Sequence, residues 1–240
     1  MALHAAPDEL VINPQTVRYA EDFANLQKLR RIYEHLLPDT LDPNLPELPP
    51  PVVREATILF SDIRGFTALS ERLADDPVRL LAVLNEHLTG AVNAVTRCGG
   101  VIEKFVGDGL MASFGARREQ PDQAERAVAA GLALIGANER LNRRKAPGDF
   151  RLDVGVGISF GKLVVGVIGP PHRAEFGILG DPVNVAARLV ASAGPAEMLL
   201  GEHVYKAAQN NINPETVGRT SIRGRSGEIT VYRINLGRRS

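Results

Sequence analysis

The sequence predicts an α+β fold of the ferredoxin-like (palm) type, an antiparallel sheet with flanking helices, preceded by an N-terminal helix. Three observations support this. Apolar, β-branched runs and segments of helical periodicity alternate in the order β-α-β-β-α-β. A Gly-Asp-Gly turn at 107–109 and a glycine at 161 separate runs that alternate as hairpin strands do. The chain has 240 residues, 44% of them hydrophobic, which suits one sizeable domain and an appendage.

The first 51 residues are predicted to stand apart from this domain. Residues 16–37 are rich in helix formers, with apolar residues three or four apart, and predict one helix. That helix can pack on its own domain, or pair with a second copy as a short coiled coil that transmits a signal. Six prolines between 38 and 51 then indicate a stiff linker. We therefore divide the chain into a helical segment with its linker, 1–51, and a main domain, 52–240.

The first half of the main domain contains one buried strand, two helices and a hairpin. Residues 56–63, ATILFSDI, form a continuous apolar run, as in a central strand. Asp76 and Pro77 suit the N-cap and first position of a helix that ends at the glycines at 99 and 100. Residues 101–106 and 110–114 flank a Gly-Asp-Gly turn, and 121–142 repeat the helical pattern.

The second half is predicted to begin with another hairpin. RLDVGVGIS and KLVVGVIG alternate on either side of Phe160 and Gly161. Asp181 and Pro182 then repeat the N-cap and proline arrangement before VNVAARLVAS. A strand at 197–200, a short helix near 202–209 and a strand pair around 219–235 complete the domain. We expect the helices to lie on one face of the sheet.

Charge and cysteine content limit the classes of partner. Lys plus Arg and Asp plus Glu both number 28, so no overall charge indicates nucleic acid or an anionic membrane. The single cysteine, Cys98, precludes an internal disulfide and favours a reducing, cytoplasmic location, although a secreted protein without bridges would have the same composition. No run approaches the roughly 18 to 20 apolar residues of a membrane span, and the start lacks the pattern of a signal peptide.

Two aspartates are expected to meet at one point of the sheet. Asp62 ends the first strand, and Asp108 lies at the tip of the hairpin that pairs beside it. Two adjacent carboxylates repel each other unless a cation lies between them, and oxygen ligands suit Mg²⁺ or Mn²⁺. Two such ions about 4 Å apart can activate a hydroxyl and hold a polyphosphate. Taken singly, either aspartate would equally well be a turn residue.

Several polar side chains are candidates for binding a nucleotide. Asn184 and Arg188 are four residues apart, hence on one helix face, where they can orient a sugar and bind a phosphate; a solvated face is the alternative. Arg223 and Arg225 flank a glycine and can grip a triphosphate, or form an ordinary basic turn. Lys104 lies in mid-strand, where a lysine is usually just exposed.

Four motifs in order give the strongest indication of function: FSDIRGFT, EKFVGDGLMASFG, ILGDPVNVAARL and IRGRSGEITVYRI. Together they resemble the catalytic domain of the class III adenylyl and guanylyl cyclases, from about residue 54 to 235. The resemblance implies these site residues: Asp62, Asp108 and the carbonyl of Ile63 as metal ligands, Lys104 reading the base, Asn184 orienting the ribose, Arg188 on the α-phosphate, and Arg225 or else Arg223 on the terminal phosphates.

The resemblance also implies a reaction and an assembly. ATP would be converted to 3′,5′-cyclic AMP, a signalling nucleotide, and pyrophosphate, with two Mg²⁺ or Mn²⁺ ions per site. The implied unit is an isologous homodimer, inactive as a monomer, whose two sites are shared between subunits. In this arrangement the metal aspartates come from one subunit, and the base, ribose and phosphate residues come from the other.

One position departs from the family pattern. The family reads adenine with a lysine and with an aspartate or threonine three residues before the glycine of its GDxVN motif, and here Gly177 has that position. A lost polar contact of about 1 to 2 kcal/mol reduces discrimination roughly tenfold. We therefore expect an adenylate cyclase with weak base selectivity. The alternatives are a guanylate or base-promiscuous cyclase, a catalytically silent nucleotide-binding regulatory dimer, and a plain interaction module.

Overall fold

The computed structural model describes residues 50–146, 149–169, 175–208, 214–221 and 228–236. The predicted N-terminal helix lies outside these residues, as does nearly all of the proline-rich linker, so the division of the chain at residue 51 stays a prediction. Arg223 and Arg225 also lie outside the described residues.

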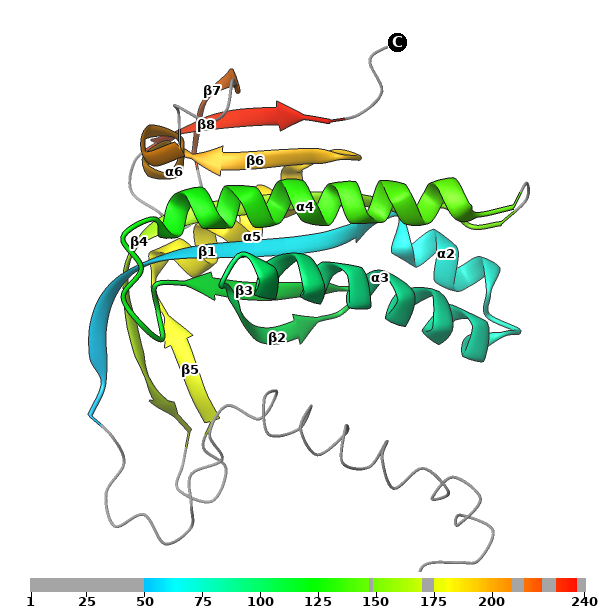
Figure 1. Cartoon of the computed structure of the whole chain (residues 1–240), viewed down its shortest axis with the longest axis horizontal. Coiled ribbons are helices and arrows are strands. Elements are labelled where there is room, and N and C mark those ends of the chain that lie inside the picture. Colours follow the sequence, from blue (N-terminus) through cyan, green and yellow to red (C-terminus); the bar gives the residue numbers. More distant parts are fainter. Residues whose placement is uncertain (1–49, 147–148, 170–174, 209–213, 222–227, 237–240) are drawn as a thin grey trace, which may run out of the picture. The chain divides into compact units, whose positions relative to one another are not determined.

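Helices and strands follow one another closely in the order that the sequence predicts (Figure 1). They are β1 (Val52–Arg64), α2 (Phe66–Arg72), α3 (Pro77–Arg97), β2 (Val101–Val106), β3 (Gly109–Phe114), α4 (Gln123–Arg144), β4 (Asp153–Ile168), β5 (Glu175–Leu179), α5 (Asp181–Ser192), β6 (Glu197–Gly201), α6 (Glu202–Ala208), β7 (Glu215–Ser221) and β8 (Glu228–Asn235). The Asp76 side chain accepts a hydrogen bond from the amide of Arg79, so the predicted N-cap of α3 is confirmed.

The strands form one mostly antiparallel sheet. Within the described residues its order is β2-β3-β1-β4-β6-β8-β7, and β5 pairs with the second half of β4. Among the described strands, β4 and β6 are the only pair that runs parallel. The α+β prediction with flanking helices is thus confirmed, and β1 lies in the middle of the sheet, between β3 and β4.

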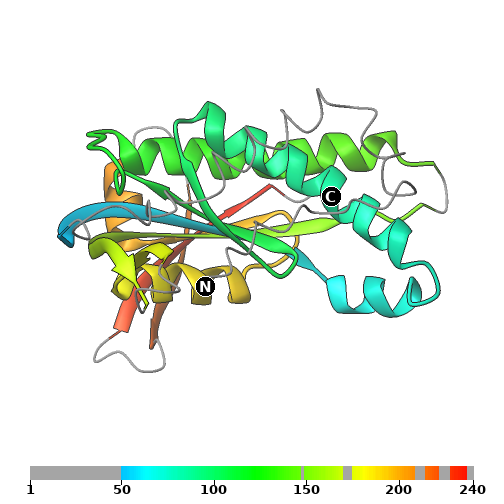
Figure 2. The same ribbon diagram turned by 90° about the horizontal axis from the view of Figure 1, so that it is seen from below.

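Helices cover both faces of this sheet, so the expectation of a single helical face is wrong for α5. On one face α3, α4 and α6 pack over Leu59, Leu110 and Ile158. On the other face α5 packs over Ile58 and other apolar strand residues, and Figure 2 shows α5 on the side of the sheet opposite to α3 and α4. The reason lies in β1, which is buried at every residue from Ala56 to Ser61. A strand buried on both sides needs a covering layer on each face.

The hairpin predicted at residues 160 and 161 is also wrong. β4 continues through both residues as one 16-residue strand, and its hairpin partner is β5, which follows residues 170–174. Two glycines of β4, Gly157 and the predicted turn residue Gly161, make room for α5 instead. A Cβ on Gly157 would lie 2.3 Å from the backbone nitrogen of Val190, and one on Gly161 would lie 3.0 Å from Pro182. The helix therefore packs its backbone directly against this strand.

Candidate active site

The two predicted metal aspartates meet at the end of β1. The register of β1 and β3 places Ser61 opposite Leu110, and the tip of the β2-β3 hairpin then lies beside Asp62. A Cβ on Gly109 would lie 1.9 Å from the carbonyl oxygen of Ser61, so only glycine allows this approach. The amide of Ile63 donates a hydrogen bond of 3.0 Å to Oδ2 of Asp108. The hairpin turn thus brings the second carboxylate against the backbone that carries the first.

Ile63 fixes the main chain between these two acids. Its side chain is buried in a small apolar cluster with Leu69, Leu73 and Leu152. The pairing of β1 with β3 ends at Ser61, and the Ile63 amide binds the Asp108 carboxylate. The amide and the carbonyl of one strand residue point to the same side of the strand. The Ile63 carbonyl therefore points to the side where Asp108 lies.

The carboxyl group of Asp62 lies in an environment that opposes its ionisation. Burial and then the nearby charge of Asp108 raise its pKa above the ordinary value of 3.8, while the Arg64 guanidinium lowers it. Arg64 donates a hydrogen bond to Oδ2 of Asp62, yet the net direction stays upward. A cation bound between the two acids would relieve this repulsion.

The donor set limits which metal can bind here. No three Asp, Glu, His or Cys side chains among the described residues come together as a metal site. The available ligands are two carboxylates and one main-chain carbonyl. Mg²⁺ commonly uses one or two carboxylates and completes its shell with water and substrate phosphates. The residues therefore fit Mg²⁺ or Mn²⁺ that binds together with a polyphosphate.

Asn184 and Arg188 lie on the exposed face of α5, as predicted from their spacing. The helix differs from the prediction at its start, because Gly180 is the N-cap and Asp181 is already helical, with no side-chain cap. In the described residues, none of the hydrogen bonds or ion pairs joins Asn184 or Arg188 to the two metal aspartates. The two groups of residues therefore lie on different elements, the aspartates at the end of β1 and in the β2-β3 turn, and Asn184 and Arg188 on α5.

The two positions expected to read the base are linked by a residue that the sequence did not indicate. Lys104 is exposed on β2, and Gly177 lies on β5, where it pairs with Gly166 of β4. The Arg117 guanidinium binds the carboxylate of Glu103 at 2.5 Å and lies 4.3 Å from the ring centroid of Phe176. Arg117 thus joins the immediate neighbours of Lys104 and Gly177, which lie on different strands.

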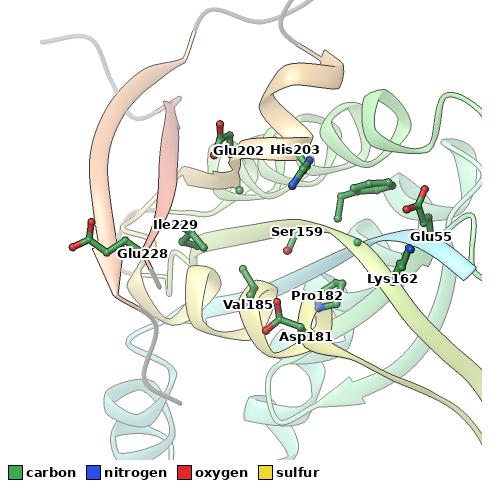
Figure 3. A pocket seen from close by; sticks show the side chains of 13 residues that line it. Glu55, Ser159, Lys162, Asp181, Pro182, Val185, Glu202, His203, Glu228 and Ile229 are labelled. Atoms are coloured by element: carbon green, nitrogen blue, oxygen red, sulfur yellow. The ribbon is translucent and has the colours of Figure 1, made fainter. Parts of the chain in front are cut away.

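A cavity among the described residues lies away from the two metal aspartates. Its volume is about 430 Å³, and its lining includes the start of α5, the middle of β4 and the start of α6. Figure 3 shows Asp181 and Val185 of α5, Ser159 of β4, and Glu202 and His203 of α6 around this space. Among the described candidates, Asp62, Ile63, Asp108, Asn184 and Arg188 are absent from its lining.

Comparison with known proteins identifies the family. Residues 49–236 match the model of the adenylate and guanylate cyclase catalytic domain. The chain belongs to this family, the class III nucleotide cyclases. Over 78% of its length the chain is 32% identical to the terminal-differentiation-specific adenylate cyclase of Dictyostelium discoideum, and over 75% it is 28% identical to an adenylate cyclase of Anabaena cylindrica. The aligned segment spans only 9% and 37% of those two cyclases.

Solved cyclase structures share the fold. The adenylyl cyclase CyaB of P. aeruginosa superimposes with a TM-score of 0.74 at 32% identity, covering 80% of this chain and 98% of that one. The guanylyl cyclase Cya2 gives a TM-score of 0.69, also at 32% identity, covering 76% and 92%. The nucleotide cyclase domain is thus established, and both substrate types occur among similar structures. In the described part of the chain, no helix is long and apolar enough to cross a membrane.

Proposed function

We propose that this cyclase domain is an adenylate cyclase that converts ATP to 3′,5′-cyclic AMP and pyrophosphate. The observation that carries this proposal is the meeting of Asp62 and Asp108 around the main chain of Ile63. It provides a clustered set of hard oxygen ligands at the end of a rigid, central strand. Such a site suits the positioning and charge neutralisation on which phosphoryl-transfer chemistry depends.

The chain's own residues account for the remaining roles. Asn184 would hold the ribose so that the 3′ hydroxyl lies in line with the α-phosphorus. Arg188 would neutralise the charge that develops on the α-phosphate while the new O3′–P bond forms. Pyrophosphate would leave toward Arg225, with Arg223 as the other candidate. Mg²⁺ or Mn²⁺ held by Asp62, Asp108 and the Ile63 carbonyl would lower the pKa of the attacking hydroxyl and balance the charge of the pyrophosphate.

The functional unit in this proposal is a homodimer with two shared sites. Asn184 and Arg188 are exposed on α5, and no hydrogen bond or ion pair of the described residues joins them to the two metal aspartates of their own chain. This separation supports a site in which one subunit supplies the aspartates and its partner supplies Asn184 and Arg188. A single subunit would then bind the metal without completing the site.

Guanylate or mixed-base cyclase activity is the second candidate function. Gly177 offers no side chain to accept a hydrogen bond from the 6-amino group of adenine, and identity to the guanylyl cyclase Cya2 equals that to the adenylyl cyclase CyaB. Against this, Lys104 on β2 is a donor, which suits N1 of adenine, whereas guanine would require an acceptor there. Adenine is therefore favoured, with weak discrimination.

The test is an assay of the full chain with Mn²⁺ and either ATP or GTP. Asp62→Asn and Asp108→Asn should each lower turnover at least a hundredfold, because a neutral amide is a far weaker ligand for a divalent cation. Asp75→Asn, which changes an exposed aspartate before α3, is the matched control and should retain full activity. Turnover of GTP above that of ATP would refute the adenylate assignment. Equal turnover in the wild type and both aspartate variants would refute the site.

A further inference from the structure

Arg64 contacts both the metal carboxylate and the carboxyl end of α5. It is the last residue of β1, two positions after Asp62, and its side chain is largely buried, with 19% exposed. One guanidinium nitrogen donates to Oδ2 of Asp62. Another donates to the carbonyl oxygen of Ala193, the C-cap of α5, at 3.3 Å. The Arg64 guanidinium thus connects the predicted metal ligand Asp62 with α5, the helix that carries Asn184 and Arg188.

The local packing holds the guanidinium in this place. Gly155 of β4 pairs with Asp62 of β1, and a Cβ on Gly155 would lie 3.3 Å from Nε of Arg64 and 3.1 Å from Cβ of Ala193. Arg64 therefore crosses the strand where the lack of a side chain leaves room. Its Nε is buried and has no hydrogen-bond partner among the described residues. The carbonyl at a helix C-terminus also attracts a cation.

We propose that Arg64 is a positioning residue that competes with the divalent cation for Asp62 and links the metal carboxylate to α5. The proposal rests on the proposed function, because only that function gives Asp62 and α5 their roles. Arg64 itself is not among the residues to which the cyclase resemblance assigns a role.

The competition follows from charge. The Asp62 carboxylate has two oxygens, and Arg64 occupies Oδ2. A divalent cation on the same carboxylate must share it with a positive charge at hydrogen-bonding distance. Wild-type affinity for the cation is therefore lower than the two carboxylates alone would give. Replacing the guanidinium by a neutral amide should strengthen cation binding even though it removes a native contact.

The link to α5 follows from the second hydrogen bond. When the Asp62 carboxylate turns toward a bound cation, the guanidinium that it holds shifts, and so does the contact with Ala193. α5 is one continuous helix, Asp181–Ser192, so a shift at its carboxyl end would pass to its other residues. Its exposed face carries Asn184 and Arg188, which in the proposed dimer serve the partner's site. Arg64 thus relates metal binding at one site to the geometry of the other.

The competition is tested without turnover by titrating the full chain with Mn²⁺ alone. The EPR signal of free Mn²⁺ reports how much of the ion stays unbound. Arg64→Gln should bind Mn²⁺ about tenfold more tightly than wild type. Arg64→Lys keeps the charge and should stay within about threefold. The matched control is Arg97→Gln, at an exposed position at the end of α3, and thermal unfolding confirms that each variant folds. Unchanged or weaker Mn²⁺ binding by Arg64→Gln would overturn the competition.

Mixed dimers test the link. One subunit carries Arg188→Ala and keeps its aspartates, while the other carries Asp108→Asn and keeps α5, so a single working site remains. Arg64→Gln is first added to the Asp108→Asn subunit, which supplies α5 to the working site but not its metal ligands. This change should lower kcat at least threefold without changing the Mn²⁺ dependence of the activity. Added to the Arg188→Ala subunit, it should change the Mn²⁺ dependence. No effect of the first addition would overturn the link. An inactive parent pair would count against the shared site of the proposed function, and the Mn²⁺ titration would still decide the competition.

Discussion

Substituting Gly177 by threonine tests how the site selects its base. Gly177 lies on β5 opposite Gly166, at the position where the family has an aspartate or threonine that accepts a hydrogen bond from adenine. Gly177→Thr supplies this acceptor with a β-branched residue that suits a strand. Gly177→Ala adds the same Cβ without an acceptor and is the matched control.

The effect of Gly177→Thr on turnover has two parts, a strain that is common to both nucleotides and a hydrogen bond that is available to adenine only. A Cβ on Gly177 would lie 2.5 Å from Cδ1 of Ile168. This atom is the end of a flexible, partly exposed side chain, so Ile168 can rotate at a cost of about 0.5 to 1.5 kcal/mol. That cost is the same for both nucleotides and cancels in their ratio. The new hydrogen bond contributes about 1 to 2 kcal/mol for adenine only, which corresponds to roughly a tenfold change in selectivity.

The assay measures kcat/KM for ATP and for GTP with Mn²⁺ in the wild type and both variants. We expect the ATP to GTP ratio to rise about tenfold in Gly177→Thr relative to Gly177→Ala. The alanine variant should have the wild-type ratio, even if strain lowers both rates. Equal ratios in the threonine and alanine variants would show that Gly177 does not face the base, and would refute its assignment to the position three residues before the glycine of the GDxVN motif.

Three further changes test other parts of the structure. Gly109→Ala should lower the free energy of unfolding in urea by at least about 1 to 3 kcal/mol and reduce turnover, because its Cβ overlaps the facing backbone of β1; Gly90→Ala in α3 meets only an ordinary contact at 3.6 Å and should be neutral or stabilising. Burial lowers the pKa of His87 below 6.5, so unfolding free energy should decrease as pH falls below 6.5, by up to about 1.4 kcal/mol per pH unit, and His87→Gln should flatten this slope in urea titrations at pH 7.5 to 5.5. Arg117→Met should raise KM for the nucleotide and leave Mn²⁺ binding unchanged, because it leaves the buried Glu103 carboxylate without its cation; an unaltered KM would show that Arg117 does not support the base-reading positions.

Local patterns were sufficient to predict most of the fold and the meeting of the two aspartates. A strand buried at every residue from Ala56 to Ser61, a two-residue turn between Val106 and Gly109 and antiparallel pairing together place Asp108 beside Asp62. These features depend on residues close in sequence and on one simple pairing rule. The same reasoning failed for the glycines of β4, because a glycine that admits a helix backbone has the same sequence pattern as one that forms a turn.

Arg64 and Arg117 could not be assigned roles from the sequence for a related reason. Their contacts join segments far apart in the chain; Arg64 and Ala193, for example, are 129 residues apart. A single arginine after a strand is compatible with many partners, and only the packed structure selects one. The sequence therefore predicts residues that act through local geometry better than residues that position others.

The charges at the end of β1 connect the locally predicted pair, Asp62 and Asp108, with the arginine that the sequence did not indicate, Arg64. Burial and Asp108 raise the pKa of Asp62, and Arg64 opposes them. Because this carboxyl has a raised pKa in the folded chain, its environment favours folding below pH 3.8 and loses that contribution as pH rises through the raised value. At neutral pH the fold therefore keeps a pair of acids at a cost in stability. A chain that needed only a stable turn would gain by replacing one acid with an amide, and this cost supports the cation-binding role proposed for the pair.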